Sequence, residues 1–140
     1  MIEHILMFVD STASAGSVTE FVARLAITYQ SKVTVLHAYK PAPSSAFGTY
    51  FLGFSTNNGS IQAKGVVNGS VKRLRQMGVE DVKGEVMVGS PLKMLNQASK
   101  SLEPDLIVIG STGNNFPSDY DRIPTEAAGS RPKPVPVLIV

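Results

Sequence analysis

Apolar residues along the chain change their spacing several times, and each change predicts a different secondary-structure element. Short apolar runs are typical of strands buried on both faces of a sheet, whereas alternation is typical of a strand with one exposed face. The segment Val82–Val88 alternates in this way and predicts a half-exposed edge strand. Apolar runs predict four further strands, at 5–9, 33–38, 105–109 and 135–140.

Three amphipathic helices are predicted between these strands. The first begins either with a capping box at 17–20 or with Ser14 as its N-cap. The second spans 61–77, and the third begins with Ser90 as N-cap and Pro91 at its first position. Apolar residues recur at helical spacing in each: Val18, Phe21, Val22, Leu25 and Ala26 in the first, Ala63, Val67, Val71 and Leu74 in the second, and Leu95, Ala98 and Leu102 in the third.

This alternation of strands and helices predicts the α/β class. Right-handed crossovers would place the strands in a mainly parallel sheet with helices on both faces. A length of 140 residues suits a single domain, 1–140, with one core. Residues 40–60 follow no period, and loops of that length are usually functional lids or disordered. Their aromatic group is interpreted as a lid, a dimer contact or side chains partly buried against the domain: Phe47, Tyr50, Phe51 and Phe54.

The composition excludes several classes of protein. The chain has no cysteine, which excludes disulfides, thiolate metal sites and a cysteine nucleophile. The net charge is only +2 and forms no basic stripe, so nucleic-acid binding gains no support. No apolar run approaches the ~20 residues that cross a bilayer, and no signal peptide fits before the first strand. We therefore expect a cytoplasmic protein whose partners include neither nucleic acid nor membrane.

The candidate chemistry lies where the strand at 105–109 gives way to a glycine-punctuated turn. Ligands of open α/β sheets bind at the carboxyl ends of the strands, beside a switch point. Backbone amides around Gly110 and Gly113 could cradle a phosphate there, although a tight turn is the alternative interpretation. Asp10 ends the first strand, where it would accept hydrogen bonds from a ribose hydroxyl or an adenine edge. A turn or helix-capping role for Asp10 is equally open.

The two histidines indicate neither a catalytic residue nor a metal site. His37 ends the second strand without a recognisable partner, which favours a hydrogen-bonded core histidine over a general base. His4 lies at the amino end of a strand, away from the expected site, and two histidines so placed form no metal cluster. The chain also lacks a Gly-x-Ser-x-Gly elbow and a P-loop.

Taken together, five segments of the chain resemble the universal stress protein family. They are Ile-Leu-Met-Phe-Val-Asp (5–10), Val-Leu-His-Ala (35–38), Val-Gly-Ser-Pro (88–91), Asp-Leu-Ile-Val-Ile-Gly-Ser-Thr-Gly (105–113) and Pro-Val-Leu-Ile-Val (136–140). The resemblance covers nearly the whole chain. It implies an open five-stranded parallel sheet in the order 3-2-1-4-5, a Rossmann-like fold of the adenine nucleotide alpha hydrolase-like type. Family members commonly form homodimers through the last strand; many bind ATP or AMP, and others bind no nucleotide.

The second half of the family's nucleotide-binding motif is altered in this chain. Nucleotide-binding members carry Gly-x-x-Gly, then nine residues, then Gly and Ser or Thr. Gly110 and Gly113 match the first half, but the count of nine residues ends on Ile123-Pro124. Ile123 places a branched side chain where phosphate would approach closely, and Pro124 has neither an amide proton nor a hydroxyl.

The neighbouring residues do not restore the motif. Asp119 and Asp121 add negative charge to a loop that would face phosphates, and Arg122 offsets it only in part. Thr125 lies one position late and would substitute for the missing hydroxyl only after a local shift of the loop.

Two functions remain open on this pattern. In the first interpretation, the chain is a dimeric regulatory or protective protein, not an enzyme, and binds ATP weakly or not at all. In the alternative, it is a stress-response sensor that binds an adenine nucleotide, AMP or ATP, so no cofactor is certain. The residues expected at the nucleotide site are Phe8, Val9, Asp10, Ala38, Ile109, Gly110, Ser111, Gly113 and Thr125. We expect the homodimer to form through the apolar last strand, because natural proteins pair or cover such an edge.

Overall fold

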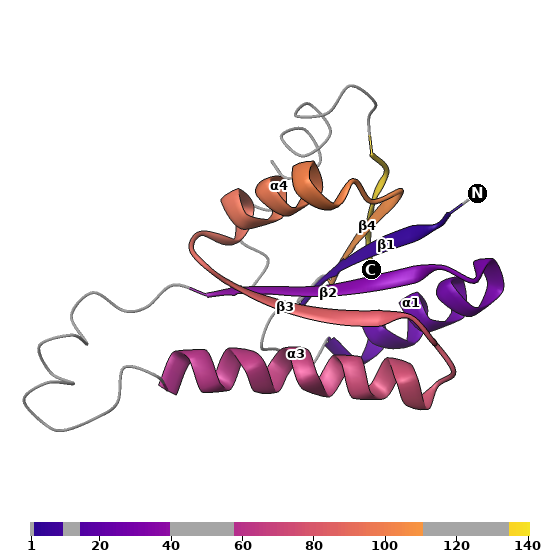
Figure 1. Cartoon of the computed structure of the whole chain (residues 1–140), viewed down its shortest axis with the longest axis horizontal. Coiled ribbons are helices and arrows are strands. Elements are labelled where there is room, and N and C mark those ends of the chain that lie inside the picture. Colours follow the sequence, from indigo (N-terminus) through magenta and orange to yellow (C-terminus); the bar gives the residue numbers. More distant parts are fainter. Residues whose placement is uncertain (1, 10–14, 40–57, 111–134) are drawn as a thin grey trace, which may run out of the picture.

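The computed structural model describes residues 2–9, 15–39, 58–110 and 135–140, in which strands alternate with helices (Figure 1). The described elements are β1 (His4–Phe8), α1 (Ala15–Tyr29), β2 (Lys32–Tyr39), α3 (Asn58–Gln76), β3 (Val82–Val88), α4 (Pro91–Leu102), β4 (Leu106–Ile109) and β5 (Val137–Ile139). This order confirms the predicted α/β class. Each predicted strand is present, with bounds that agree or differ by one or two residues.

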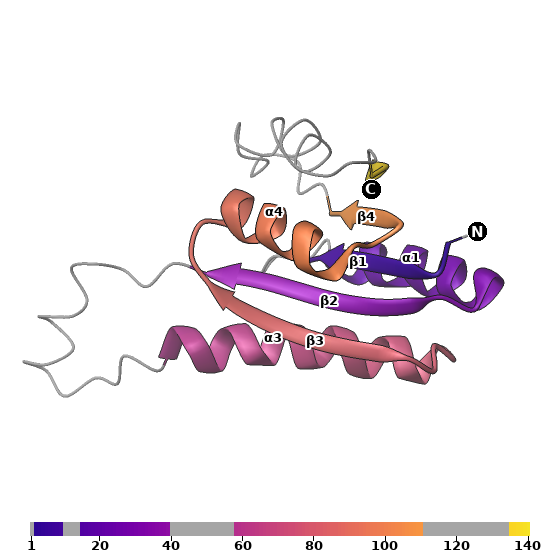
Figure 2. The same cartoon turned by 45° about the horizontal axis from the view of Figure 1, so that its top comes forward.

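The strands form one five-stranded sheet in the order β3-β2-β1-β4-β5, in which every neighbouring pair is parallel. Figure 2 shows the arrowheads of β1, β2, β3 and β4 pointing the same way. β1 is the central strand, and its last residue Phe8 is in register with Leu36 of β2 and with Ile109 of β4. The strand order that the family resemblance implies is therefore correct.

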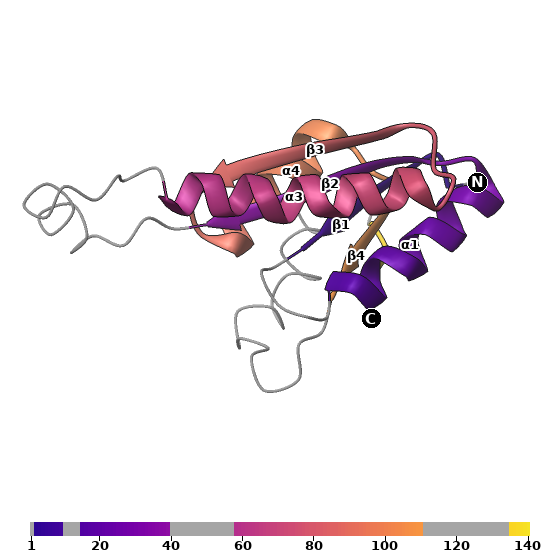
Figure 3. The same cartoon turned by 90° about the horizontal axis from the view of Figure 1, so that it is seen from below.

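The helices cover both faces of the sheet. α1 and α3 lie on one face and α4 on the other (Figures 1 and 3). Because successive side chains of a strand point to opposite faces, Met7 enters the core beneath α1 and α3, whereas Phe8 enters the core beneath α4. The first core also contains Ile5, Val9, Val18, Val22, Val33, Val35, Val67, Leu74 and Val108, and the second contains Leu6, Leu36, Leu95, Ile107, Ile109 and Val135.

Burial along the strands explains their apolar pattern. All residues of β1 and β4 are buried, so both faces of these strands require apolar side chains. β3 lies at an edge of the sheet and exposes Lys83 and Glu85. The predicted half-exposed edge strand is thus confirmed.

Of the two predicted starts of the first helix, the capping box at 17–20 is wrong, whereas the start after Ser14 agrees with the structure in position. α1 begins at Ala15, so Ser17 lies inside the helix and cannot be its N-cap, while Ser14 lies outside the described residues. Glu20, the partner that suggested a capping box, pairs instead with Arg73 of α3, at 3.3 Å between Oε1 and a guanidinium nitrogen. The second helix begins three residues earlier than predicted and ends one residue earlier, at Gln76.

The start of α4 agrees with its prediction in position but not in chemistry. Ser90 is the N-cap with extended backbone angles, and Pro91 is the first helical residue. The Ser90 side chain forms no capping hydrogen bond; its main-chain carbonyl accepts from the N–H of Met94 at 2.9 Å. The first N–H groups of a helix have no acceptor within the helix. Because proline at the first helical position has no N–H, one of these unpaired donors is absent from α4.

Each of these helices ends in a residue with a left-handed backbone: Gln30 (φ 55°) after α1, Gly78 (φ 108°) after α3 and Glu103 (φ 48°) after α4. The N–H of Ser31 bonds the carbonyl of Ala26 at 2.9 Å, and the N–H of Val79 bonds that of Leu74 at 3.0 Å. These are the six-to-one bonds of a Schellman motif. The motif favours glycine, so Gln30 holds a conformation that costs a side-chain-bearing residue free energy.

Gly84 allows β3 to approach α3 closely. A Cβ atom at this position would overlap Cγ1 of Val67 and lie 3.1 Å from Cγ2 of Val71, both in α3. By contrast, a Cβ atom at Gly65 or Gly69, on the exposed side of α3, would meet nothing within 4 Å.

We expect Gly84→Ala to destabilise the protein by about 1–3 kcal/mol, because the added methyl group must displace packed side chains. Gly65→Ala is the matched control: it adds the same methyl group to open space and should raise stability by about 0.5–1 kcal/mol, since alanine favours a helix. Urea denaturation of both variants measures the difference. Equal effects of the two substitutions would show that β3 and α3 are not in tight contact.

Candidate functional site

The carboxyl ends of β1 and β4 lie side by side at one edge of the sheet. α1 follows β1 on one face, whereas α4 leads into β4 from the other face (Figures 1 and 3). This reversal makes the carboxyl ends of the two adjacent strands a topological switch point, where open α/β sheets bind ligands. Phe8 and Ile109 are register partners, and Val9 and Gly110 follow them directly. The structure therefore brings these four predicted site residues together.

Four of the predicted site residues have buried side chains. Phe8, Val9, Ala38 and Ile109 are each between 1% and 6% exposed. Val9 belongs to the core beneath α1 and α3, and the other three belong to the core beneath α4. A ligand at this edge would thus meet main-chain atoms of these residues more readily than their side chains. Gly110 is half-buried and has no side chain to shield its main chain.

Several main-chain groups at this edge already have partners within the protein. The N–H of Val9 donates to the carbonyl of Leu36 at 2.9 Å, and the carbonyl of Ile109 accepts from the N–H of Val140 at the same distance. The carbonyl of Val9 accepts from Nδ1 of His37 at 2.7 Å. A carbonyl oxygen has two lone pairs, so these bonds occupy one acceptor position each of Val9 and Ile109, whereas the single N–H of Val9 is already used.

His37 connects the ends of β1 and β2. Because a carbonyl only accepts, the contact with Val9 requires the proton of His37 on Nδ1. The side chain is only 9% exposed and comes from the interior of β2. The prediction of a hydrogen-bonded core histidine is confirmed. What the sequence could not indicate is its partner, the main chain immediately before Asp10.

The remaining predicted site residues lie outside the described residues. This applies to Asp10, Ser111, Gly113 and Thr125, and also to the altered motif at 123–124. The segment 40–57, with the aromatic residues interpreted as a lid, a dimer contact or partly buried side chains, lies outside them as well. Their roles stay predictions from sequence.

Comparison with known proteins decides the family. The sequence profile of the universal stress protein family matches residues 1–140. The chain belongs to this family. Among curated proteins, no relative matches it.

Solved structures of universal stress proteins share the fold. The universal stress protein UspA from Lactobacillus plantarum is 21% identical, with a TM-score of 0.77, and the match covers 99% of this chain and 97% of that one. A universal stress protein from Archaeoglobus fulgidus, solved in complex with dAMP, is 22% identical, with a TM-score of 0.72 and coverage of 99% and 98%. A third, in complex with cAMP, is 19% identical, with a TM-score of 0.68 and coverage of 99% and 96%.

In this universal stress protein, the amino ends of the strands are tied by a carboxylate. Oδ2 of Asp105 accepts the main-chain N–H groups of both Glu3 and His4 at 2.9 Å, and the N–H of Asp105 donates to the carbonyl of His4 at 2.8 Å. One side chain thereby fixes the start of β1 against the start of β4. In the sequence, Asp105 was only the first residue of a predicted strand, and nothing indicated this role.

His4 is a buried histidine at the same end of the sheet. Its Nε2 lies 2.8 Å from Oγ1 of Thr34 in β2. Burial is the largest influence and lowers the pKa of His4 below its ordinary value of 6.5, and the charge of Lys32 lowers it further. A hydrogen bond with the backbone of Leu102 and the charges of Asp105 and Asp81 raise this pKa without cancelling the burial effect. His4 therefore resists protonation in the folded state.

Two further features bear on what the site can do. Within the described ranges, no group of three or more histidine, aspartate or glutamate side chains is placed to hold a metal ion. None of the described helices combines the length and apolar character that a membrane span needs.

We expect the free energy of unfolding to fall as the pH drops below 6.5. The folded pKa of His4 lies below its unfolded value, so acid protonates the unfolded state first and favours it. The stability is complete above the unfolded pKa and is lost as the pH falls toward the folded one. Urea denaturation at about pH 7.5 and pH 5.5 measures this loss.

His4→Gln keeps a polar group near Thr34 but cannot titrate, so it should show a smaller loss of stability with acid than the unaltered chain. All other titrating groups are common to the two proteins, and the difference therefore isolates His4. An identical pH dependence would rule out His4 as the source.

Proposed function

We propose that this chain is a dimeric regulatory or protective universal stress protein in which the crevice between β1 and β4 binds Mg-ATP weakly or not at all. One observation carries the proposal: Ile123-Pro124 stands where nucleotide-binding members have glycine followed by serine or threonine. A proline cannot donate a main-chain hydrogen bond, and an isoleucine side chain would occupy the space that a phosphate needs. The negative charges of Asp119 and Asp121 act in the same direction.

A second candidate function is the sensing of a nucleoside monophosphate. It is favoured by the two structural neighbours that were solved with cAMP and dAMP, ligands with a single phosphate group. The half of the site that would hold the nucleoside keeps its expected residues, Asp10 after β1 and Gly110 after β4. The loss of phosphate contacts at 123–124 would weaken a triphosphate more than a monophosphate.

Regulation rather than catalysis follows from the same residues. Among the described residues, the histidine nearest to the crevice, His37, is engaged with the carbonyl of Val9 and is buried. No nucleophile paired with a base can be named in the sequence. The proposal treats 1–140 as one domain acting in the cytoplasm through a partner that responds to its state.

The apolar last strand supports assembly as a dimer. β5 pairs with β4 on one side only, at the end of the sheet opposite to β3. Leu138 and Ile139 are 39% and 44% exposed, large fractions for such side chains in a strand. An apolar edge of this kind promotes aggregation unless it is paired or covered, and a two-fold dimer pairs each copy with the other.

Calorimetry with Mg-ATP should detect no tight site, and a sub-micromolar dissociation constant would overturn the proposal. The double substitution Ile123→Gly with Pro124→Ser should raise the affinity by about tenfold or more, because hydrogen bonds to charged groups contribute roughly 1.5–3 kcal/mol each.

Titration with AMP tests the second candidate in parallel. Here Asp10→Ala should abolish binding without unfolding the protein; unchanged AMP binding would assign Asp10 to turn capping instead.

Light scattering of the intact chain should give about twice the chain mass of 14.9 kDa. Leu138→Glu should yield monomer or insoluble protein, because it places a charge in the paired edge. Ile61→Glu is the control: Ile61 is an exposed apolar residue of α3, away from β5, and its substitution should leave the dimer intact. A well-behaved monomer of the unaltered chain at micromolar concentration would contradict the dimer.

A further inference from the structure

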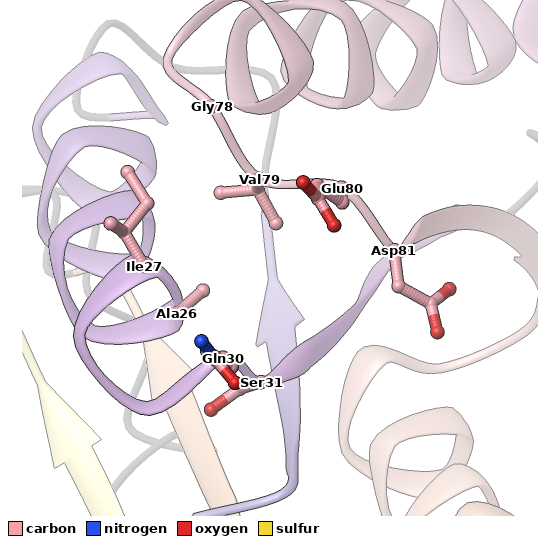
Figure 4. A pocket seen from close by; sticks show the side chains of 8 residues that line it. All are labelled: Ala26, Ile27, Gln30, Ser31, Gly78, Val79, Glu80 and Asp81. Atoms are coloured by element: carbon pink, nitrogen blue, oxygen red, sulfur yellow. The ribbon is translucent and has the colours of Figure 1, made fainter.

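A pocket of about 480 Å³ lies at the opposite end of the sheet from the nucleotide crevice. It is formed between the end of α1 and the loop that joins α3 to β3, beside the amino ends of β2 and β3 (Figure 4). The residues that line it are Ala26, Ile27, Gln30, Ser31, Gly78, Val79, Glu80 and Asp81. Its volume lies within the range of sites that hold small organic molecules.

The pocket is lined by both apolar and polar residues. Ala26 and Val79 are buried at 2% and 4% exposure, and Ile27 remains 48% exposed beside them. Gln30, Glu80 and Asp81 are exposed and contribute an amide and two carboxylates. Figure 4 shows Gln30 at the end of α1 and Glu80 and Asp81 on the loop, with the carboxylate of Asp81 directed away from Ile27 and Val79. Such a combination suits a ligand with a short apolar body and a polar end.

The charge at this pocket is negative. No lysine, arginine or histidine lines it, and the one salt bridge among the described residues, Arg73 with Glu20, does not involve Glu80 or Asp81. Arg75 of α3 donates to the carbonyl of Val82, the residue after Asp81, at 3.1 Å, but is not part of the lining. Lys32 follows Ser31 but lies outside the lining.

The C-terminal ends of two helices add to the negative electrostatic potential of the pocket. α1 and α3 both finish at the pocket, where the left-handed residues Gln30 and Gly78 belong to its lining. The C-terminus of a helix carries a partial negative charge, and its last carbonyls are acceptors without partners inside the helix. Two carboxylates and two helix ends of the same sign therefore lie around one cavity and make its potential negative, although main-chain N–H groups of Ser31, Gly78 and Val79 already bond carbonyls at both helix ends.

We propose that this pocket binds a small organic cation, an amine or guanidinium on a short apolar chain. The described residues offer no set of three ligands for a metal ion, whereas carbonyl, amide and carboxylate oxygens suit the several N–H donors of an organic cation. The apolar chain would lie against Ala26, Ile27 and Val79. The site is independent of the nucleotide crevice and does not rest on the function proposed for it.

Agmatine, which carries an amine and a guanidinium on a butyl chain, is a suitable probe. Titrated into isotopically labelled protein up to about 10 mM, it should shift the amide resonances of 26–31 and 78–81 and leave those at the carboxyl ends of the strands unchanged. Pentanamide, a neutral molecule of similar length, should bind at least about tenfold more weakly.

Paired variants distinguish binding of agmatine in the pocket from nonspecific attraction of the cation to acidic side chains. Glu80→Gln with Asp81→Asn should weaken agmatine by about tenfold or more, whereas Glu85→Gln with Glu103→Gln removes the same charge elsewhere and should not. Gln30→Lys should block the pocket with a tethered ammonium. The proposal is overturned if agmatine shifts no resonance at 26–31 and 78–81, if both double variants weaken it equally, or if pentanamide binds as well.

Discussion

The simultaneous burial of both faces of β1 and β4 is the constraint on which the rest of this protein depends. A parallel sheet has no face that can be left to water, so helices must cover it on both sides. α1 and α3 supply one cover and α4 the other, and neither cover alone would bury the central strands. The switch point at the carboxyl ends follows from the same arrangement, because α1 leaves β1 on one face and α4 enters β4 from the other.

This constraint also explains how much of the fold could be predicted from the sequence. Leu106–Ile109 is recognisable as a strand because burial on both faces leaves no polar residue in it. The sequence left the start of α1 open between two positions, because Ser17 and Glu20 have the spacing of a capping box while Ser14 is also a suitable N-cap. The carboxylate of Glu20 instead accepts a hydrogen bond from Arg73 on another helix. No local sequence pattern indicates a contact between residues 53 positions apart.

The candidate site divides in the same manner. The position of the site follows from the strand order. This strand order was predicted from the succession of hydrophobic runs together with the family resemblance. The contact of His37 with the carbonyl of Val9 depends on the register between β1 and β2. This register cannot be predicted from the sequence of either strand alone. No sequence pattern indicates the acidic pocket, since its walls come from a helix end and a four-residue stretch, 78–81, that has no periodicity.

The two edges of the sheet differ in chemistry, and this difference limits how copies of the chain can associate. β3 presents the exposed charges of Lys83 and Glu85, whereas β5 presents Leu138 and Ile139. An open sheet with two adhesive edges would add copies without end, as fibrils do. With charges on one edge, pairing through the other edge would use up the apolar surface after a single contact. In the proposed dimer, this asymmetry would keep the assembly finite although its last strand is strongly apolar.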